Sequence, residues 1–257
     1  MIFQQAIVRA PGPNFADGLT TAKLGAPVLE RALGQHEAYC RALETCGLSL
    51  VRLEPDLRHP DAPFVEDAAV VTAGCAILAR PGTAARRGEI PAIRAALAGL
   101  YPSLSAIEPP GTVEGGDVCQ AGDHFWIGVS HRTNEEGAVQ LGRWLRRKGF
   151  TTARIDIRQV AGLLHLKSGL AYLGDRRLAV ADDLAGHPEL AGYDAVRVEA
   201  AERYAANCVR INDRVLVAAG HPRFEATLRA LGCSPLPLEM SEFQKMDGGL
   251  SCLSLRF

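Results

Sequence analysis

The stretch FVEDAAVVTAGCAILAR, residues 64–80, has the pattern of two short apolar strands around a turn at Thr72-Ala73-Gly74. Similar strand pairs follow over residues 117–129, 169–181 and 208–217, each with a Gly, Asp or Asn turn at its middle. Single short strands are expected at the two ends of the chain, over residues 4–9 and 250–256. Pairing these two would complete a fifth unit, so the repeat predicts a ring that the termini close.

Helical patterns separate these strand pairs. The clearest follows Asn134, a typical N-cap residue, and ends before Gly149, with an apolar stripe formed by Ala138, Leu141 and Leu145. Further helices are expected over residues 27–47, 84–97 and 222–231, where Pro91 limits how far upstream the second is regular. The order of strand pair, helix and strand predicts a radial α/β fold in a single domain over residues 1–257. The first strand of each unit should lie at its centre.

Composition excludes several classes of protein. The chain has 257 residues, 47% of them apolar and 22% charged, with a net charge of −1 and no basic run longer than Arg146-Arg147-Lys148. A nucleic-acid partner is therefore not expected, and neither is a membrane partner, because no apolar stretch approaches the ~20 residues that span a bilayer. The amino terminus lacks a secretory pattern, so a cytoplasmic protein with reduced thiols is predicted.

No cofactor is expected. The seven cysteines form no Cys-x-x-Cys pair, and no His-Glu-x-x-His or glycine-rich phosphate loop is present. The sequence therefore predicts neither a dedicated metal site nor a nucleotide cofactor.

Reactive side chains stand at the start of the predicted first strands. Because these positions would face one axial channel, they should converge although they are distant in sequence; they are Glu66, Asp67, Glu114, Asp117, His165, Asn207 and Cys252. A cysteine, a histidine and carboxylates together are typical of a thiol nucleophile with an acid/base partner and a site for a cation.

Each of these residues also has a purely structural interpretation. Most lone cysteines are small core residues, although Cys252 follows a Gly-Gly loop whereas Cys75 and Cys208 lie in apolar strands. The Glu114-Gly115-Gly116-Asp117 segment is also ordinary turn chemistry. Spacing alone is equally consistent with Arg86 and Arg132 being solvated surface charges.

Eight segments, spread in order along the whole chain, resemble the dimethylarginine dimethylaminohydrolase (dimethylargininase) family. That family has the five-fold ββαβ propeller called the pentein fold. The most specific are Phe64-Val65-Glu66-Asp67, Gly115-Gly116-Asp117, Ser130-His131-Arg132-Thr133-Asn134, His165-Leu166-Lys167-Ser168 and the segment from Lys245 to Cys252. The resemblance implies hydrolysis of N-omega-methylated arginines to citrulline and methylamines through a covalent S-alkylthiouronium.

The resemblance also assigns roles. Cys252 would be the nucleophile, His165 the general acid and base, and Glu114 the residue that orients His165. Asp67, with Glu66 beside it, would hold the guanidinium, and Arg86 and Arg132 the substrate carboxylate. The remaining substrate-binding positions would be Leu19, Asp61, Phe64, Met246 and Asp247.

Alternatives on the same scaffold are an arginine deiminase, an amidinotransferase and a ribosome-binding protein without catalytic activity. Deiminases of this superfamily typically carry Asp two residues after the catalytic His, whereas this chain has Lys167 there. The Cys/His/Glu set argues against a purely binding protein. The sequence leaves the oligomeric state open, with a homodimer allowed.

Overall fold

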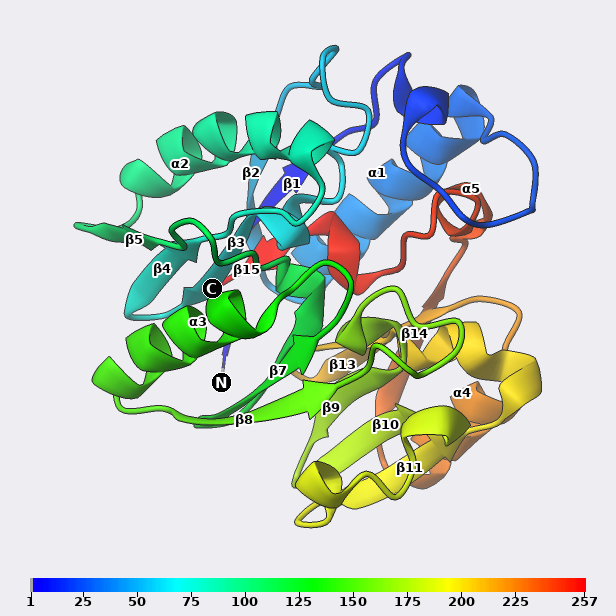
Figure 1. Cartoon of the computed structure of the whole chain (residues 1–257). Helices are drawn as coiled ribbons and strands as arrows, with labels where there is room; N and C mark the ends of the chain where they lie inside the picture. Colours follow the sequence, from blue (N-terminus) through cyan, green and yellow to red (C-terminus); the bar gives the residue numbers. More distant parts are fainter. Residues whose placement is uncertain (1) are drawn as a thin grey trace.

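The computed structural model describes residues 2–257, which form five three-stranded sheets around a central axis. Figure 1 shows the chain passing from the blue first segment round the molecule to the red last one, with both termini near the middle. The amides of Gln4 and Gln5 donate to the carbonyl of Phe257, so the two ends of the chain are hydrogen-bonded. The predicted five-fold α/β architecture is confirmed.

All five sheets have the same topology. The inner strand is antiparallel to the middle strand, and the middle strand is parallel to the outer one. In the order inner, middle, outer, the sheets are β15 (Leu255–Arg256), β1 (Gln5–Arg9) and β2 (Ser49–Leu53); β3 (Ala69–Thr72), β4 (Cys75–Leu78) and β5 (Leu104–Ala106); β6 (Val118–Ala121), β7 (His124–Val129) and β8 (Thr151–Asp156); β9 (Leu170–Gly174), β10 (Arg177–Ala181) and β11 (Asp194–Val198); β12 (Val209–Ile211), β13 (Arg214–Ala218) and β14 (Ser234–Leu238).

Four units connect their middle and outer strands through an α-helix. These helices are α1 (Leu29–Thr45), α2 (Ile90–Ala98), α3 (Glu135–Arg147) and α4 (Pro222–Ala230), and they lie at the periphery in Figure 1. A short α5 (Ser241–Gln244) follows β14. In the described chain the fourth unit has only the 3₁₀ turns Asp182–Leu184 and Pro188–Leu190 between β10 and β11. The fourth unit therefore lacks the α-helix that the expected order of strand pair, helix and strand requires. Its short connection contains Pro188 and two glycines, which disfavour a regular helix.

Three sequence expectations need correction in detail. The sequence pattern over residues 27–47 predicts an apolar face formed by Leu29, Leu33, Tyr39 and Leu43, but Leu33 is 40% exposed. The buried face of α1 runs instead through Ala32, His36, Tyr39 and Leu43. Residues 84–89 form a 3₁₀ helix and α2 starts only at Ile90, because Pro91 fits the first helical turn and not the interior. Of the strand expected over 250–256, only β15 is extended, and Ser251–Leu253 is a 3₁₀ turn.

Every inner strand is preceded, directly or within two residues, by a 3₁₀ segment. Neighbouring segments contact one another about the axis; in chain order they are Val65–Ala68, Gly115–Asp117, Leu166–Ser168, Ala200–Ala206 and Ser251–Leu253. The apolar side chains form five clusters outside this ring, between adjacent units. The axis is therefore left to polar residues. Between residues 2 and 257, no helix has both the length and the apolar character needed to cross a bilayer.

The N-cap of α3 offers a test of the local signals. The Oδ1 atom of Asn134 accepts hydrogen bonds from the amides of Gly137 and Thr112, at 2.8 and 2.9 Å. We expect Asn134→Ala to lower the free energy of unfolding by about 1–2 kcal/mol, measured by urea denaturation. Asn134→Asp keeps both acceptor bonds and should lose less than half as much. Equal losses in the two variants would contradict this role.

Candidate active site

A small cavity of about 30 Å³ lies where the inner 3₁₀ segments meet. Eleven of the twelve predicted site residues line it: Leu19, Asp61, Phe64, Asp67, Arg86, Glu114, Arg132, His165, Met246, Asp247 and Cys252. Leu164 and Gly248 complete the lining. The twelfth predicted residue, Glu66, lies outside this cavity.

His165 and Glu114 form the best-defined pair in this cavity. A ring nitrogen of His165 lies 2.8 Å from Glu114 Oε2, and both side chains are buried. Behind them, Asp117 accepts from the amide of Leu166 at 3.0 Å and from Ser130 Oγ at 2.7 Å, which fixes the backbone next to His165. The imidazole is thus held in one orientation, as an acid/base residue needs to be.

Burial and neighbouring charges set the protonation states of His165 and Cys252. Burial alone would lower the pKa of His165, but the charges of Asp67 and Asp117 and the bond with Glu114 outweigh it and raise that pKa to about 9. Burial raises the pKa of the Cys252 thiol to about 12, and the negative charges of Glu66 and Asp67 act in the same direction. At neutral pH, with these neighbours alone, His165 is therefore an imidazolium and Cys252 a neutral thiol.

Asp67 has an internal cationic partner. Its Oδ2 lies 2.6 Å from Arg86 Nη1, and its Oδ1 accepts from the amide of Gly116 at 2.8 Å. Burial would raise the pKa of Asp67, but the positive charges of His165 and Arg86 lower it to about 2. Arg86 also donates to both oxygens of Glu89 at 2.9 Å. The carboxylate predicted to hold a guanidinium thus already contacts one.

The rim of the cavity carries the other predicted binding residues. Asp61 accepts from the amide of Leu19 at 3.0 Å, and Asp247 accepts from the amide of Thr21 at 2.5 Å. Arg132 Nη1 lies 3.6 Å from Glu114 Oε1, a buried oxygen that has no hydrogen-bond partner in the described structure. The rim therefore combines a guanidinium, carboxylates and backbone groups around a small cavity.

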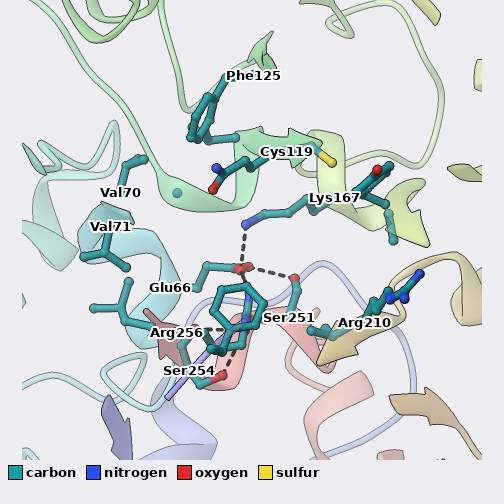
Figure 2. A pocket seen from close by; sticks show the side chains of 18 of the residues that line it. Glu66, Val70, Val71, Cys119, Phe125, Lys167, Arg210, Ser251, Ser254 and Arg256 are labelled. Carbon is teal, nitrogen blue, oxygen red and sulfur yellow. Dashed lines mark hydrogen bonds and ion pairs between the residues drawn. The ribbon is translucent and has the colours of Figure 1, made fainter. Parts of the chain in front are cut away.

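Glu66 faces the opposite side of the axis, where a larger cavity of about 340 Å³ lies. Its carboxylate accepts from Ser251 Oγ at 2.7 Å and lies 2.6 Å from Lys167 Nζ and 2.9 Å from Arg256 Nη2. Figure 2 shows Lys167 and Ser251 both directed at this carboxylate. Cys252, His165 and Glu114 are not among the residues that line the larger cavity, so the predicted catalytic residues meet only at the smaller one.

Asp67, Glu114 and His165 are the group best arranged for a cation. One ligand atom from each lies within 4.8 Å of the others, and all three side chains are buried. Two carboxylates and an imidazole could hold a metal ion, but the same geometry also suits an organic cation such as a guanidinium.

Sequence reasoning missed the residues that support the site from behind. Glu89 binds Arg86, and Thr133 Oγ1 accepts from the amide of Glu114 at 3.1 Å. Leu164 and Gly248 adjoin predicted residues, and a Cβ at position 248 would lie 2.2 Å from the Phe64 ring. Proximity to His165 and Asp247 in sequence was the only signal that could have identified these two.

Comparison with known proteins gives consistent matches, although a scan against models of protein families finds none. The chain is 44% identical to N(G),N(G)-dimethylarginine dimethylaminohydrolase of Pseudomonas aeruginosa, covering 100% of both chains. A solved structure of a cysteine-to-serine mutant of that organism's enzyme with citrulline matches with a TM-score of 0.97 at 43% identity, again over 100% of both chains. A histidine-to-glycine mutant in an adduct with S-methyl-L-thiocitrulline matches with a TM-score of 0.96, at the same identity and coverage.

The Glu114–His165 pair generates a prediction about titration. In Glu114→Gln, His165 loses a charged acceptor, so its pKa should fall measurably below about 9, although Asp67 and Asp117 still raise it. The neutral fraction of the imidazole at pH 8 should therefore increase. NMR titration of the His165 ring protons measures this shift. The exposed Glu136→Gln variant should leave the titration unchanged, and an unchanged pKa in Glu114→Gln would contradict the pairing.

Proposed function

The chain belongs to the dimethylarginine dimethylaminohydrolase family, and we propose that it hydrolyses N-omega-methylated arginines to citrulline and methylamines. The observation that carries the proposal is the convergence of Cys252, His165, Glu114 and Asp67 on one buried cavity. The relatives solved with citrulline and with S-methyl-L-thiocitrulline support the same class of ligand.

The substrate's own charge would activate the nucleophile. A thiol with a pKa near 12 is almost entirely protonated at pH 7, so Cys252 alone is a poor nucleophile. His165 already carries a proton, so it cannot act as a base toward the thiol. A guanidinium held by Asp67 adds a positive charge beside Cys252 and lowers the pKa of the thiol. The thiol proton leaves to solvent, and the thiolate forms next to the carbon that it attacks.

The covalent step follows from that placement. The Cys252 sulfur bonds to the guanidinium carbon and gives a tetrahedral adduct. The imidazolium of His165 donates its proton to the methylated nitrogen, the carbon–nitrogen bond breaks, and the methylamine leaves. An S-alkylthiouronium remains on Cys252.

Water completes the cycle. The now neutral His165 takes a proton from a water molecule that attacks the thiouronium carbon. The carbon–sulfur bond then breaks, the proton of the new hydroxyl passes to the departing sulfur, citrulline leaves and Cys252 is again a neutral thiol. Glu114 keeps the imidazole in one orientation through both proton transfers, and its charge stabilises the imidazolium.

The rim would recognise the amino-acid end of the substrate. Arg132 offers donors for the carboxylate, and Asp61 offers acceptors for the ammonium group. Arg86 also lines the cavity, but its guanidinium donates to Asp67, to Glu89 and to two backbone carbonyls, so it would have to exchange one of these bonds to help bind the carboxylate. Leu19, Met246 and Asp247 would cover the substrate with Phe64. Because the cavity holds only about 30 Å³, these covering residues must move before an arginine-sized molecule can bind.

The remaining expectations stay part of the proposal. Residues 1–257 would act as one catalytic unit, since the residues that line the cavity range from Leu19 near one end of the chain to Cys252 near the other. The seven cysteines are all free thiols, which suits a reducing, cytoplasmic location. A homodimer remains a prediction.

The alternative activity on this scaffold is arginine deimination. A deiminase would be expected to carry a second carboxylate two residues after the catalytic His. In this chain Lys167 stands there, and its ammonium pairs with Glu66, which lines the larger cavity. One side of the guanidinium is therefore free of an obligatory acceptor, so N-methyl groups fit without leaving a buried charge unpaired.

The substrate preference tests the proposal directly. We expect kcat/KM for asymmetric dimethylarginine to exceed that for arginine by at least about tenfold, because a site that does not bind every N–H accepts methylated nitrogens. Citrulline, dimethylamine and ammonia are measured in parallel, with Cys252→Ser as the inactive control. If arginine is the better substrate and ammonia the product, the deiminase activity replaces the proposed one.

Arg132 tests carboxylate recognition. Arg132→Lys keeps the charge but removes the two-donor fork, so KM should rise by about tenfold while kcat changes by less than about threefold. Arg154→Lys, at an exposed position paired with Glu135, is the matched control. An unchanged KM in Arg132→Lys would show that its guanidinium does not bind the substrate.

A further inference from the structure

Five equivalent 3₁₀ segments reach the axis, and the function proposed above uses four of them. Those segments, or the residues next to them, supply Cys252, Asp67, Glu114 and His165. The fifth segment, Ala200–Ala206, is followed directly by its C-cap residue Asn207. Asn207 is 7% exposed and has no role in the proposed function. Asn207 is therefore the fifth unit's contribution at the centre of the molecule.

The Asn207 side chain bridges the segments that carry Cys252 and His165. Its Oδ1 accepts from the amide of Ser251 at 2.9 Å, and its Nδ2 donates to the carbonyl of Lys167 at 2.9 Å. Nδ2 also lies 3.2 Å from Ser251 Oγ. Ser251 precedes Cys252, and Lys167 stands two residues after His165, so a single amide connects the two segments.

The Asn207 side chain packs closely against the loop that precedes Cys252. A Cβ on Gly249 would lie 2.5 Å from Asn207 Cγ and 2.6 Å from its Oδ1, so the amide packs directly on the Gly249 backbone. The hydroxyl of Tyr204, from the same 3₁₀ segment, donates to the carbonyl of Gly248 at 2.8 Å. The fifth unit thus holds the loop before Cys252 at two points.

We propose that Asn207 is a positioning residue that fixes the Cys252 segment against the His165 segment, and so places the sulfur over the bound cation. The task needs an acceptor for the Ser251 amide and a donor for the Lys167 carbonyl on one short side chain. An amide provides both, whereas a carboxylate only accepts and an aliphatic side chain does neither. The inference rests on the proposed function for the roles of Cys252 and His165.

Asn207→Asp is the principal test, and Asn212→Asp is its matched control. Asn212 makes the same kinds of bond, accepting from the amide of Phe3 at 2.8 Å and donating to the carbonyls of Phe3 and Cys46. Neither asparagine lines the small cavity, but the partners of Asn212 are not adjacent in sequence to Cys252 or His165, whereas those of Asn207 are. Both substitutions remove side-chain donor bonds that are at least partly buried, so a similar loss in urea stability is expected for both.

We expect kcat with asymmetric dimethylarginine to fall about 100-fold in Asn207→Asp, with KM changed by less than about threefold, because a small misplacement of reacting groups costs rate more than binding. Asn212→Asp should keep kcat within about threefold of the wild type. Equal kcat losses in the two variants, or an unchanged kcat in Asn207→Asp, would overturn the proposal.

A second measurement needs no turnover. The rates at which 2-chloroacetamidine, a cation, and iodoacetamide, a neutral reagent, alkylate Cys252 are compared in each variant. Misplacement of the sulfur relative to Asp67 should lower the ratio of these rates about tenfold in Asn207→Asp. A purely electrostatic effect of the added carboxylate would raise the ratio, because negative charge favours the cationic reagent. An unchanged or raised ratio would therefore reject positioning.

This ratio separates the two proposals. Wild-type protein that alkylates with a high ratio but does not hydrolyse methylarginines would refute the proposed function and leave the role of Asn207 open to the same test. If Asn207→Asp does not fold, Gly249→Ala displaces the amide while keeping it intact. We then expect the same lowered ratio, and an unchanged ratio would reject the proposal.

Discussion

The carboxylate of Glu66 is the contact on which the centre of the molecule depends. It joins Lys167 of the fourth unit to Ser251 and Arg256 of the first, while itself belonging to the second. Buried charges are tolerated only when every partner is present, and removing one member of such a pair costs about 3–5 kcal/mol because the other is left unpaired. Asp67 follows Glu66, Cys252 follows Ser251, and His165 stands two residues before Lys167. The contacts of the Glu66 carboxylate therefore also bring Asp67, His165 and Cys252 together.

Structural and chemical roles are separated between close neighbours in sequence. Asp67 and Cys252 line the small cavity, whereas Glu66 and Ser251, each one residue earlier, line the larger one. The 3₁₀ segments explain this, because three residues per turn rotate successive side chains by about 120°. His165 and Lys167 are divided in the same way. One short turn can therefore hold a charge that fixes the fold and a charge available to a ligand, without the two competing for one partner.

Local signals in the sequence were sufficient for most of the fold. The Asn212-Asp213 turn and the Asn134 cap are decided by nearby residues, so they could be predicted. The cavity that the Glu66 side chain faces could not be predicted, because the adjacent carboxylates of Glu66 and Asp67 look equivalent in sequence. Only the ion pairs of Glu66 with Lys167 and Arg256, more than 100 residues away, distinguish the two. The contact of Arg86 with Glu89 and Asp67 depends in the same way on how the second unit folds back. Long-range partners, not propensities, set these details.

The charge balance around the small cavity connects recognition with reactivity. Asp61, Asp67, Glu89, Glu114 and Asp117 are all buried here. The cations facing them are Arg86, the imidazolium of His165, the buried Arg9 near Glu89 and the partly exposed Arg132 beside Glu114. This excess of negative charge keeps His165 protonated and, with burial, keeps Cys252 neutral. A ligand can relieve the excess only by bringing positive charge, and the proposed substrate brings it on the carbon that Cys252 attacks. In the proposed mechanism, selection of the cation and ionisation of the thiol would therefore be one interaction, and the Cys252 thiol would stay protonated until a cationic ligand is bound.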